Sequence, residues 1–576
     1  MTDLPSNWIC RNIVKSDRKI FKEICCSPLL LELLAKRNIV TEQEIISFLN
    51  PSLNDFHDIM KMPGIKEGIK RLKEAIEKKE NILIYGDYDA DGVISASIMY
   101  KFLKELELEA EVYIPDRFNE GYDLSIEFIK KISAESKYSL IISVDCGTNS
   151  EPVQKFIKGN KAPDIIVCDH HNQSVELDTN RQDYIIINPK LKNSKYPFKD
   201  LSGAAVTFKF ITGILRKLED RYRNKFKKDY LTNLLDLVAI STIADIMPLI
   251  NENRIIVKRG LAVLNKTINP GLKKMISTII KDKEYIDEYD VGFIIAPRLN
   301  AAGRIKNARE SFDLLVKEGD ILTKIADELN FFNMERQKIQ KNIFNEIIEN
   351  NDFSKIVPEK KIFIDKSKNW SEGVLGVVAS DIVKKYNIPV ILFKESEGKL
   401  KGSGRSIDKF DLYGNLVLCS NLFDRFGGHR LACGINMDLS NYGTFYSNFM
   451  KIVDKSLKKD DIEKKNVFDI EIDFKDINKD ILYEINLLRP FGYGNPKPCF
   501  VTRDCVLVDF FYLSEEKHIR LKLKQAGTTV DAIIFGVDEK IKKKMIKNNK
   551  VNILYKIEEN KWANLSTIQL IISDLF

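Results

Sequence analysis

Four short apolar runs in the first third of the chain constrain its fold more than any other feature. They occupy residues 81–85 (NILIY), 139–144 (SLIISV), 165–168 (IIVC) and 184–187 (YIII). Each run is apolar on both faces, and charged helical segments separate the first two. Strands that are buried on both faces are typical of a parallel sheet covered by helices. The sequence therefore predicts an α/β domain.

The rest of the chain predicts further domains, because 576 residues exceed what one ordinary hydrophobic core can bury. Residues 1–80 indicate short helices. A segment over 320–350 places Ile321, Ile325 and Leu329 at helical spacing. Residues 519–524 alternate apolar and basic side chains, as in a strand of a small barrel. The expected order is an N-terminal helical region 1–80, an α/β domain 81–318, a connecting helix 319–352, a second α/β domain 353–465 and a β-barrel 466–576.

Composition favours a globular protein, with 44% hydrophobic and 30% charged residues. The net charge of +7 permits a polyanionic partner without requiring one. No apolar run is long enough to cross a bilayer, and residues 1–22 lack the apolar core of a signal peptide. We therefore expect a cytoplasmic protein with no membrane partner. The nine cysteines follow no metal-binding spacing, so we expect reduced thiols.

Three carboxylates follow the first apolar run, at Asp87, Asp89 and Asp91, between two glycines. Like charges this close repel one another, so the group requires a cation. An acidic surface turn with side-chain capping is the alternative for this motif taken alone. An EF-hand is excluded because the twelfth position of the loop is Ile98.

The later runs end in similar residues. Asp145 follows the second run, Asp169, His170 and His171 follow the third, and Asp245 follows the apolar stretch 234–243. The carboxyl ends of parallel strands share one edge of a sheet, where ligands bind. Carboxylates with an imidazole suit Mn²⁺ or Mg²⁺, and this many acids favour two ions that activate water for in-line attack on a phosphate.

These motifs resemble the DHH phosphoesterase family. GDYDADG at 86–92, SVDCG at 143–147, CDHH at 168–171 and ADIMP at 244–248 resemble its four acidic motifs in the right order. APRLNAAGRI at 296–305, GSGRSI at 402–407, FGGHRLACG at 426–434 and PFGYGNPKP at 490–498 resemble the RecJ branch. The similarity spans nearly the whole chain.

The resemblance implies a fold and an activity. The fold is a parallel-sheet DHH catalytic domain, a DHHA1-like α/β domain joined to it by the long helix, and an OB-like barrel. The activity is metal-dependent degradation of single-stranded DNA, 5′ to 3′, to mononucleotides in recombination and repair. A single-strand-binding protein and a helicase are expected partners.

The resemblance also assigns residues. The implied metal ligands are Asp87, Asp89, Asp91, Asp145, His170 and Asp245. Asp145 is expected to bridge two ions, His171 to face the substrate, and Asp169 to orient an imidazole. The implied DNA-binding residues are Arg298, Asn300, Arg304, Ser403, Arg405, Ser406 and His429. On spacing alone, Arg298, Asn300 and Arg304 indicate an ordinary solvated face. The Gly/Ser loop at 403–406 is weak evidence for anion binding, and His429 is a loop histidine.

The sequence departs from the family pattern at three positions. Ser371 follows Trp370 where the family usually has His, Cys433 replaces an Ala, and Cys146 stands where Asn is common. None of these changes removes an expected ligand. Two other functions remain open at this point: another DHH phosphoesterase, such as a pyrophosphatase or small-nucleotide phosphodiesterase, and a non-catalytic DNA-binding replication scaffold.

Overall fold

The computed structural model describes residues 4–12, 26–117, 120–121, 123–174, 181–281, 283–537, 539–562 and 565–576. Contacts divide the chain into two compact units. Unit 1 contains residues 1–58, 246–262 and 465–576, and unit 2 contains residues 59–245 and 263–464. None of the helices built from described residues is both long and apolar enough to cross a membrane.

The first sheet of unit 2 is parallel throughout. Its strand order is β3 (Ala110–Tyr113), β2 (Ile82–Gly86), β4 (Leu140–Val144), β5 (Asp164–Cys168), β6 (Tyr184–Ile187). The four predicted strands are confirmed. The edge strand β3 was not predicted, because it is only partly buried and lacks an apolar run. Gly86 pairs with Val144, and Val144 pairs with Cys168. The acidic motifs therefore begin side by side at one edge.

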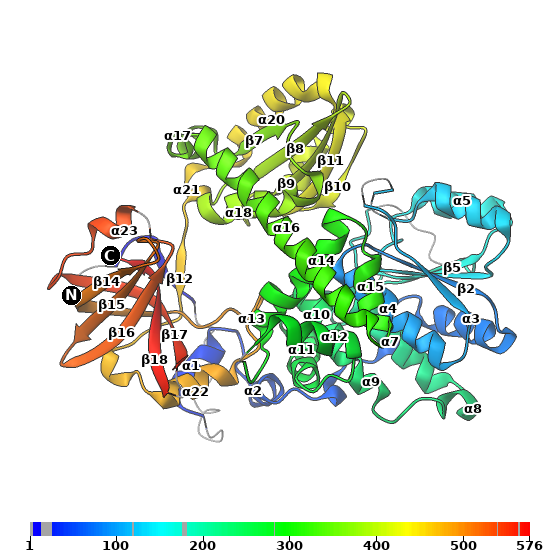
Figure 1. Ribbon diagram of the computed structural model, residues 1–576, viewed down its shortest axis with the longest axis horizontal. Coiled ribbons are helices and arrows are strands. Elements are labelled where there is room, and N and C mark those ends of the chain that lie inside the picture. Colours follow the sequence, from blue (N-terminus) through cyan, green and yellow to red (C-terminus); the bar gives the residue numbers. More distant parts are fainter. Residues whose placement is uncertain are drawn as a thin grey trace. The chain divides into compact units, whose positions relative to one another are not determined.

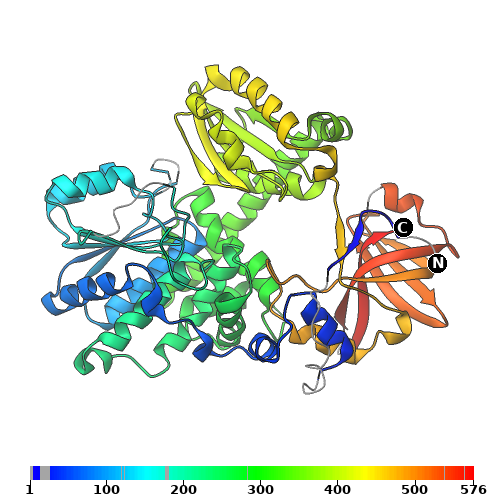
Figure 2. The same ribbon diagram turned by 180° about the vertical axis from the view of Figure 1, so that it is seen from behind.

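Helices cover both faces of this sheet, which explains why its strands are apolar on both sides (Figure 1 and Figure 2). One face packs against α3 (Ile65–Lys78), α4 (Ala90–Glu105) and α7 (Gly203–Lys217). The other face shares a hydrophobic core with α5 (Ile126–Glu135) and α6 (Glu151–Gly159).

Further helices complete the first half of unit 2. They are α8 (Asp220–Arg223), α9 (Tyr230–Asn233), α10 (Leu235–Ala244), α12 (Pro270–Ile279), α13 (Glu288–Asp290), the π-helix η4 (Val291–Ile295), α14 (Ala296–Ile305) and α15 (Arg309–Val316). The helix α16 (Ile321–Asn350) confirms the predicted long connecting helix. Its first part packs against α12, α14 and α15, while Ile343 and Ile347 belong to the core of the second sheet.

The second sheet of unit 2 is mixed, in the order β10 (Arg425–His429), β11 (Ala432–Asp438), β9 (Lys399–Arg405), β8 (Val390–Ser396), β7 (Phe363–Ser367). Only β7 and β8 are parallel. The associated helices are α17 (Phe353–Lys360), α18 (Glu372–Tyr386), α19 (Leu412–Val417), α20 (Tyr442–Ser456) and α21 (Lys459–Ile462). The predicted second α/β domain is thus confirmed in its architecture.

Unit 1 contains the predicted barrel (Figure 2). Its strands β14 (Phe500–Leu513), β15 (His518–Gln525), β16 (Thr528–Phe535), β18 (Leu565–Leu575) and β17 (Lys550–Trp562) close through pairing of β14 with β17. In β15, Ile519, Leu521 and Leu523 are buried while the basic residues between them are exposed, as predicted. The described cysteines are free thiols, and Cys25 lies outside the described residues.

The helices α1 (Pro28–Ala35), α2 (Glu42–Leu49) and α22 (Lys479–Leu487) share the core of the barrel. The expected helical region 1–80 is therefore divided, since residues up to 58 belong to unit 1 and α3 belongs to unit 2. The helix α11 (Asn251–Leu264) lies mostly in unit 1 as well.

One arginine joins the three segments of unit 1. Arg254 in α11 is 2% exposed. Its guanidinium donates hydrogen bonds to the carbonyl oxygens of Phe48, Leu488 and Arg489 at 2.7, 3.0 and 2.9 Å. It also lies 3.5 Å from the centre of the Phe48 ring. The segment 246–262 is thus bonded to both the N-terminal and the C-terminal part of the unit.

We predict that Arg254→Met lowers the free energy of unfolding of unit 1 by at least about 3 kcal/mol, because it removes three hydrogen bonds from a charged donor to buried or partly buried carbonyl oxygens. Chemical denaturation and limited proteolysis would measure this. Arg259→Met is the control, since Arg259 donates one bond, to the Pro51 carbonyl at 2.9 Å, and should cost about 1 kcal/mol. Equal stability of the two variants would contradict the role given to Arg254.

Candidate active site

The loop after β2 holds the first acidic motif. Asp89 is the N-cap of α4, and its Oδ1 accepts hydrogen bonds from the backbone of Asp91 and Gly92 at 2.9 and 3.1 Å. A Cβ atom on Gly92 would lie 2.6 Å from Asp87. The glycine therefore allows Asp87 to remain beside the first turn of the helix.

Asp91 is held by the start of α7. Its carboxylate accepts hydrogen bonds from the backbone N–H groups of Gly203 and Ala204 at 2.7 and 2.8 Å, and from the Ser241 hydroxyl at 2.6 Å. A Cβ atom on Gly203 would lie 2.6 Å from Oδ1 of Asp145. This close approach brings the first and second acidic motifs together at the N-terminus of α7.

Asp145 begins the loop after β4 with a positive φ of 62°, which is uncommon for residues other than glycine. Its N–H donates to the Cys168 carbonyl at 2.8 Å. The Asp123 carboxylate accepts a hydrogen bond from the Gly147 N–H at 2.8 Å and so stabilises this loop. Sequence reasoning missed Asp123, because it stands outside the acidic motifs.

Asp169 organises the turn after β5. Its Oδ1 accepts hydrogen bonds from the backbone N–H groups of His170 and His171 and from Nδ1 of the His171 ring, at 2.7, 3.2 and 2.7 Å. Its Oδ2 accepts one from the Thr148 N–H at 3.1 Å. The chain turns directly after the strand, so both imidazoles lie on the same side, with ring centres 4.5 Å apart.

Asp245 is the C-cap of α10, whose residues are largely buried. The C-terminal end of a helix carries partial negative charge, which disfavours a carboxylate there unless a cation is near. Asp245 therefore adds to the need for positive charge at this edge of the sheet.

The acidic motifs converge on His170. Its Nε2 lies 3.2 Å from Oδ1 of Asp145, 3.5 Å from Oδ2 of Asp245 and 3.8 Å from Oδ2 of Asp91. Within the described part of the chain, four buried atoms of the cluster have no hydrogen-bond partner: Asp87 Oδ1, Asp145 Oδ1, Asp245 Oδ2 and His170 Nδ1. Buried polar atoms normally have partners, so these exceptions require an explanation.

Three overlapping groups of side chains place their ligand atoms close enough to share a metal ion. They are Asp87, Asp89 and Asp145; Asp91, His170 and Asp245; and Asp145, His170 and His171. Hard carboxylate oxygens with imidazole nitrogen fit Mn²⁺ or Mg²⁺. All six residues expected as ligands occur in these groups, and Asp145 occurs in two of them.

The pKa values show the same demand for cations. Burial raises the pKa of Asp87, Asp145 and Asp245 well above the ordinary value, and neighbouring carboxylates raise it further. Burial and Asp89 raise the pKa of Asp91 to about 6, despite its hydrogen bonds from Ser241 and α7. Each shift reflects a carboxylate whose negative charge is not compensated.

The two histidines differ in protonation. Burial, with the neighbouring His171 charge, lowers the pKa of His170 well below its ordinary value. Burial also opposes the charge of His171, but Asp169 outweighs it and raises the pKa of His171 to about 9. His170 is therefore neutral, as a metal ligand must be, and His171 is cationic in the metal-free protein.

A cluster of arginines lies beside the acidic loop. Burial, together with the charges of Arg117 and Arg405, lowers the pKa of Arg304 to about 9. The Arg117 guanidinium lies 5.1 Å from the centre of the Tyr88 ring. Arginines this close to one another favour an anion such as phosphate. Sequence reasoning missed Arg117, although it follows the edge strand in the segment 114–117 (IPDR).

The other residues expected at the DNA lie around this cluster. Arg405 donates to Ser403 Oγ at 3.3 Å and to the Gly404 carbonyl at 2.8 Å, and the Ser406 hydroxyl donates to the Phe410 carbonyl. The exposed His429, from the second sheet, has its ring centre 6.3 Å from that of His171. The second sheet thus brings a side chain to the histidine pair.

Two residues of α14 use polar side-chain atoms in hydrogen bonds within the protein. The Asn300 side-chain oxygen accepts a hydrogen bond from the Ala90 N–H at 2.8 Å, so it positions the acidic loop. Arg298 donates to the Asn330 side chain and to the Ile294 carbonyl at 3.0 and 2.7 Å. Direct contact of either residue with DNA stays a prediction.

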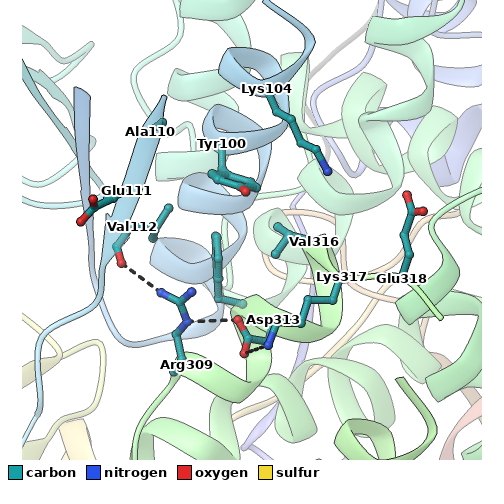
Figure 3. Close-up of a pocket in the computed structure, with 11 residues that line it drawn as sticks. Tyr100, Lys104, Ala110, Glu111, Val112, Arg309, Asp313, Val316, Lys317 and Glu318 are labelled. Carbon is teal, nitrogen blue, oxygen red and sulfur yellow. Dashed lines mark hydrogen bonds and ion pairs between the residues drawn. The ribbon is translucent and has the colours of Figure 1, made fainter. Parts of the chain in front are cut away.

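A separate cavity of about 500 Å³ lies between α4, β3 and α15 (Figure 3). Figure 3 shows its Arg309 bonded to the Val112 carbonyl and to Asp313, which also pairs with Lys317. Arg309 and Lys317 are thus paired locally, and none of the acidic motifs lines the cavity. The chemistry of the molecule therefore lies at the sheet edge.

Comparison with known families agrees with this geometry. The DHH family, N-terminal domain, matches residues 81–242, the DHHA1 domain matches residues 359–458, and the RecJ OB domain matches residues 468–574. In fold, the chain is similar to the crystal structure of RecJ in complex with Mn²⁺ from Thermus thermophilus. That match has a TM-score of 0.83 and 23% identity, and covers 99% of this chain and 80% of the other.

Curated relatives cover nearly the whole chain. The single-stranded-DNA-specific exonuclease RecJ of Bacillus subtilis is 35% identical over 97% of this chain and 69% of the relative. The protein of the same name from Haemophilus influenzae is 30% identical over 95% of both chains. These relatives favour the RecJ interpretation over the other DHH phosphoesterases considered from the sequence. The chain therefore belongs to the RecJ family.

Proposed function

We propose that this chain is a metal-dependent exonuclease that degrades single-stranded DNA from the 5′ end to mononucleotides. One observation carries the proposal: carboxylates from three separate motifs meet the histidines of a fourth, and three of the buried carboxylate oxygens lack partners. The arginine cluster beside them supplies positive charge for an anionic substrate. The names of the curated relatives support single-stranded DNA as that substrate.

The candidate ligands for two Mn²⁺ or Mg²⁺ ions are Asp87, Asp89, Asp91, Asp145, His170 and Asp245, with Asp145 shared between the ions. Such ions supply Lewis-acid charge and lower the pKa of bound water when they are present. The protein's own contribution is to hold the carboxylates rigid. The N-cap role of Asp89 and the bonds from α7 to Asp91 do this.

The histidine pair has a divided role. His171, protonated by its bond to Asp169, presents Nε2 as a donor that stabilises negative charge on the phosphate. Asp169 is the positioning residue for that imidazole. Arg304 and Arg405, together with His429, are proposed to bind the phosphate groups of the entering strand.

The wider setting is also a proposal. The resemblance to RecJ exonucleases supports work in recombination and repair in the cytoplasm, with a helicase and a single-strand-binding protein that supply the substrate. The domain limits 81–318, 319–352, 353–465 and 466–576 are proposed for the same reason.

We predict that Asp145→Asn lowers Mn²⁺-dependent digestion of single-stranded DNA by at least roughly 10²–10³-fold, the scale of losing one main electrostatic group. Asparagine is preferred to alanine because it tolerates the positive φ of this position. Substantial remaining activity at saturating Mn²⁺ would contradict the bridging role.

The same variant should be more stable than the wild type without metal. The folded-state pKa of Asp145 is raised, so its ionised form destabilises the fold increasingly as the pH rises above the unfolded value of about 4. The melting temperature difference should therefore be larger at pH 8 than at pH 5. Mn²⁺ at 100 times its Kd should stabilise the wild type by about 2.7 kcal/mol and the variant much less.

We predict that His170→Ala weakens Mn²⁺ binding, with partial rescue of activity by excess Mn²⁺. His171→Ala should retain metal binding but lose turnover by roughly 10²–10³-fold, as expected for one donor to a developing charge. Calorimetric Mn²⁺ titration and single-turnover digestion would distinguish these effects. The assignments are reversed if only His171→Ala loses an ion.

The barrel provides a further test. Arg520, Lys522 and Lys524 lie on the exposed side of β15, where they can follow a phosphate backbone. Neutralising all three should weaken DNA binding and reduce the salt slope by about 2, since each lost contact to a single strand contributes about 0.7. A charge-matched control neutralises Lys540, Lys543 and Lys547. Equal effects of both triple variants would argue against a specific path along β15.

A further inference from the structure

Two aromatic rings project from the segment that leads into α14. Tyr289 in α13 is 61% exposed and Phe293 in the π-helix η4 is 64% exposed. Their ring centres are 4.6 Å apart and their planes differ by 26°, so the rings are stacked. The spacing of four residues places both rings on one side of the helical segment.

The segment that carries these rings is firmly held. Asp287 caps α13 by accepting hydrogen bonds from the backbone of Tyr289 and Asp290 at 3.0 and 3.2 Å. Lys283 pairs with Asp290 at 2.5 Å and with Asp287 at 3.5 Å. Val291 and Ile295 are buried. The backbone that carries the two exposed rings is therefore held in place.

The position of η4 connects the rings to the active site. η4 packs against α10, where a Cβ atom on Gly292 would lie 3.4 Å from the Ile243 side chain, two residues before Asp245. At its other end η4 continues directly into α14, which carries Asn300 and Arg304. The rings thus lie on the helical segment between a candidate metal ligand and the arginine cluster.

The chemistry of the pair suits the bases of a single strand. Exposed, stacked aromatic rings offer π-faces, and every base has a π-face, so stacking on them tolerates any sequence. π-helical turns are frequent at functional sites. Arg298, one turn after Ile294, adds a guanidinium to the same segment. Exposed π-faces on a helical segment that continues toward Arg304 match a nucleic acid strand better than a protein segment.

We propose that Tyr289 and Phe293 form a stacking platform for the bases of the single strand next to the nucleotide being removed. This inference rests on the proposed exonuclease function and adds a specific contact to it. The platform would position the strand without reading its sequence, because it contacts base faces and not their edges.

The test combines protein and DNA changes in the full-length protein. Binding of 5′-phosphorylated oligonucleotides would be measured by fluorescence anisotropy in EDTA, so that no digestion occurs. Each oligonucleotide lacks the base at one successive position. For the wild type, one or two neighbouring abasic positions should weaken binding by about 5- to 100-fold, the range of one base–aromatic stack.

Phe293→Leu should bind the intact oligonucleotide about as weakly as the wild type binds the abasic one, and should be insensitive to base loss at that position. Phe293→Trp, which retains a π-face, should bind like the wild type. Tyr289→Leu should show a smaller loss at the same or the adjacent position. Because both side chains are exposed, the melting temperatures of the variants should match that of the wild type.

The platform is overturned if Phe293→Leu binds the intact strand like the wild type. It is also overturned if, at every position tested, the losses of binding free energy from Phe293→Leu and from base removal are simply additive. If the protein digests single-stranded DNA but Phe293→Leu and base removal are not coupled at any position, only the platform is refuted. A protein that shows the coupling but does not digest single-stranded DNA with Mn²⁺ refutes the proposed function alone.

Discussion

Electrostatic repulsion among buried carboxylates is the constraint on which the rest of the active site depends. Asp87, Asp145 and Asp245 have raised pKa values because burial and their neighbours disfavour ionisation. Such a cluster is costly to fold, and much of the surrounding structure opposes that cost. The N-terminus of α7 donates to Asp91, and two glycines permit the backbone to approach the acids closely. The remaining negative charge attracts cations. The free energy lost in burying the carboxylates therefore favours metal binding.

Asp169 shows how one carboxylate can serve geometry instead of metal binding. Its oxygens accept four hydrogen bonds from the protein, and its pKa is lowered by the charge of His171 although burial opposes this. It therefore remains ionised without a metal ion. Asp145 differs, because its Oδ1 has no hydrogen-bond partner. Asp169 therefore shapes the turn, whereas Asp145 is available to bind a metal ion.

The sequence predicted the features that depend on local pattern. The four central strands, the long helix α16 and the alternation in β15 have apolar periodicities that are visible in the sequence, and their ends located the acidic motifs. The edge strand β3 was missed because one side of it is uncovered, and Arg117 was missed with it. Asp123 and the Tyr289–Phe293 pair were missed for a different reason: their roles depend on partners more than ten residues away or on exposure, and neither leaves a local pattern.

The composition of unit 1 has a consequence for how the protein is made. Its core combines α1 and α2 with strands from the last hundred or so residues, and Arg254 bonds the middle segment to both. These segments cannot assemble until β17 and β18 have been synthesised, whereas the first sheet of unit 2 is complete once β6 has been synthesised. During synthesis, the apolar faces of α1 and α2 must therefore wait uncovered while more than 400 residues are added. Such exposed surface is prone to aggregation until the barrel strands are available to cover it.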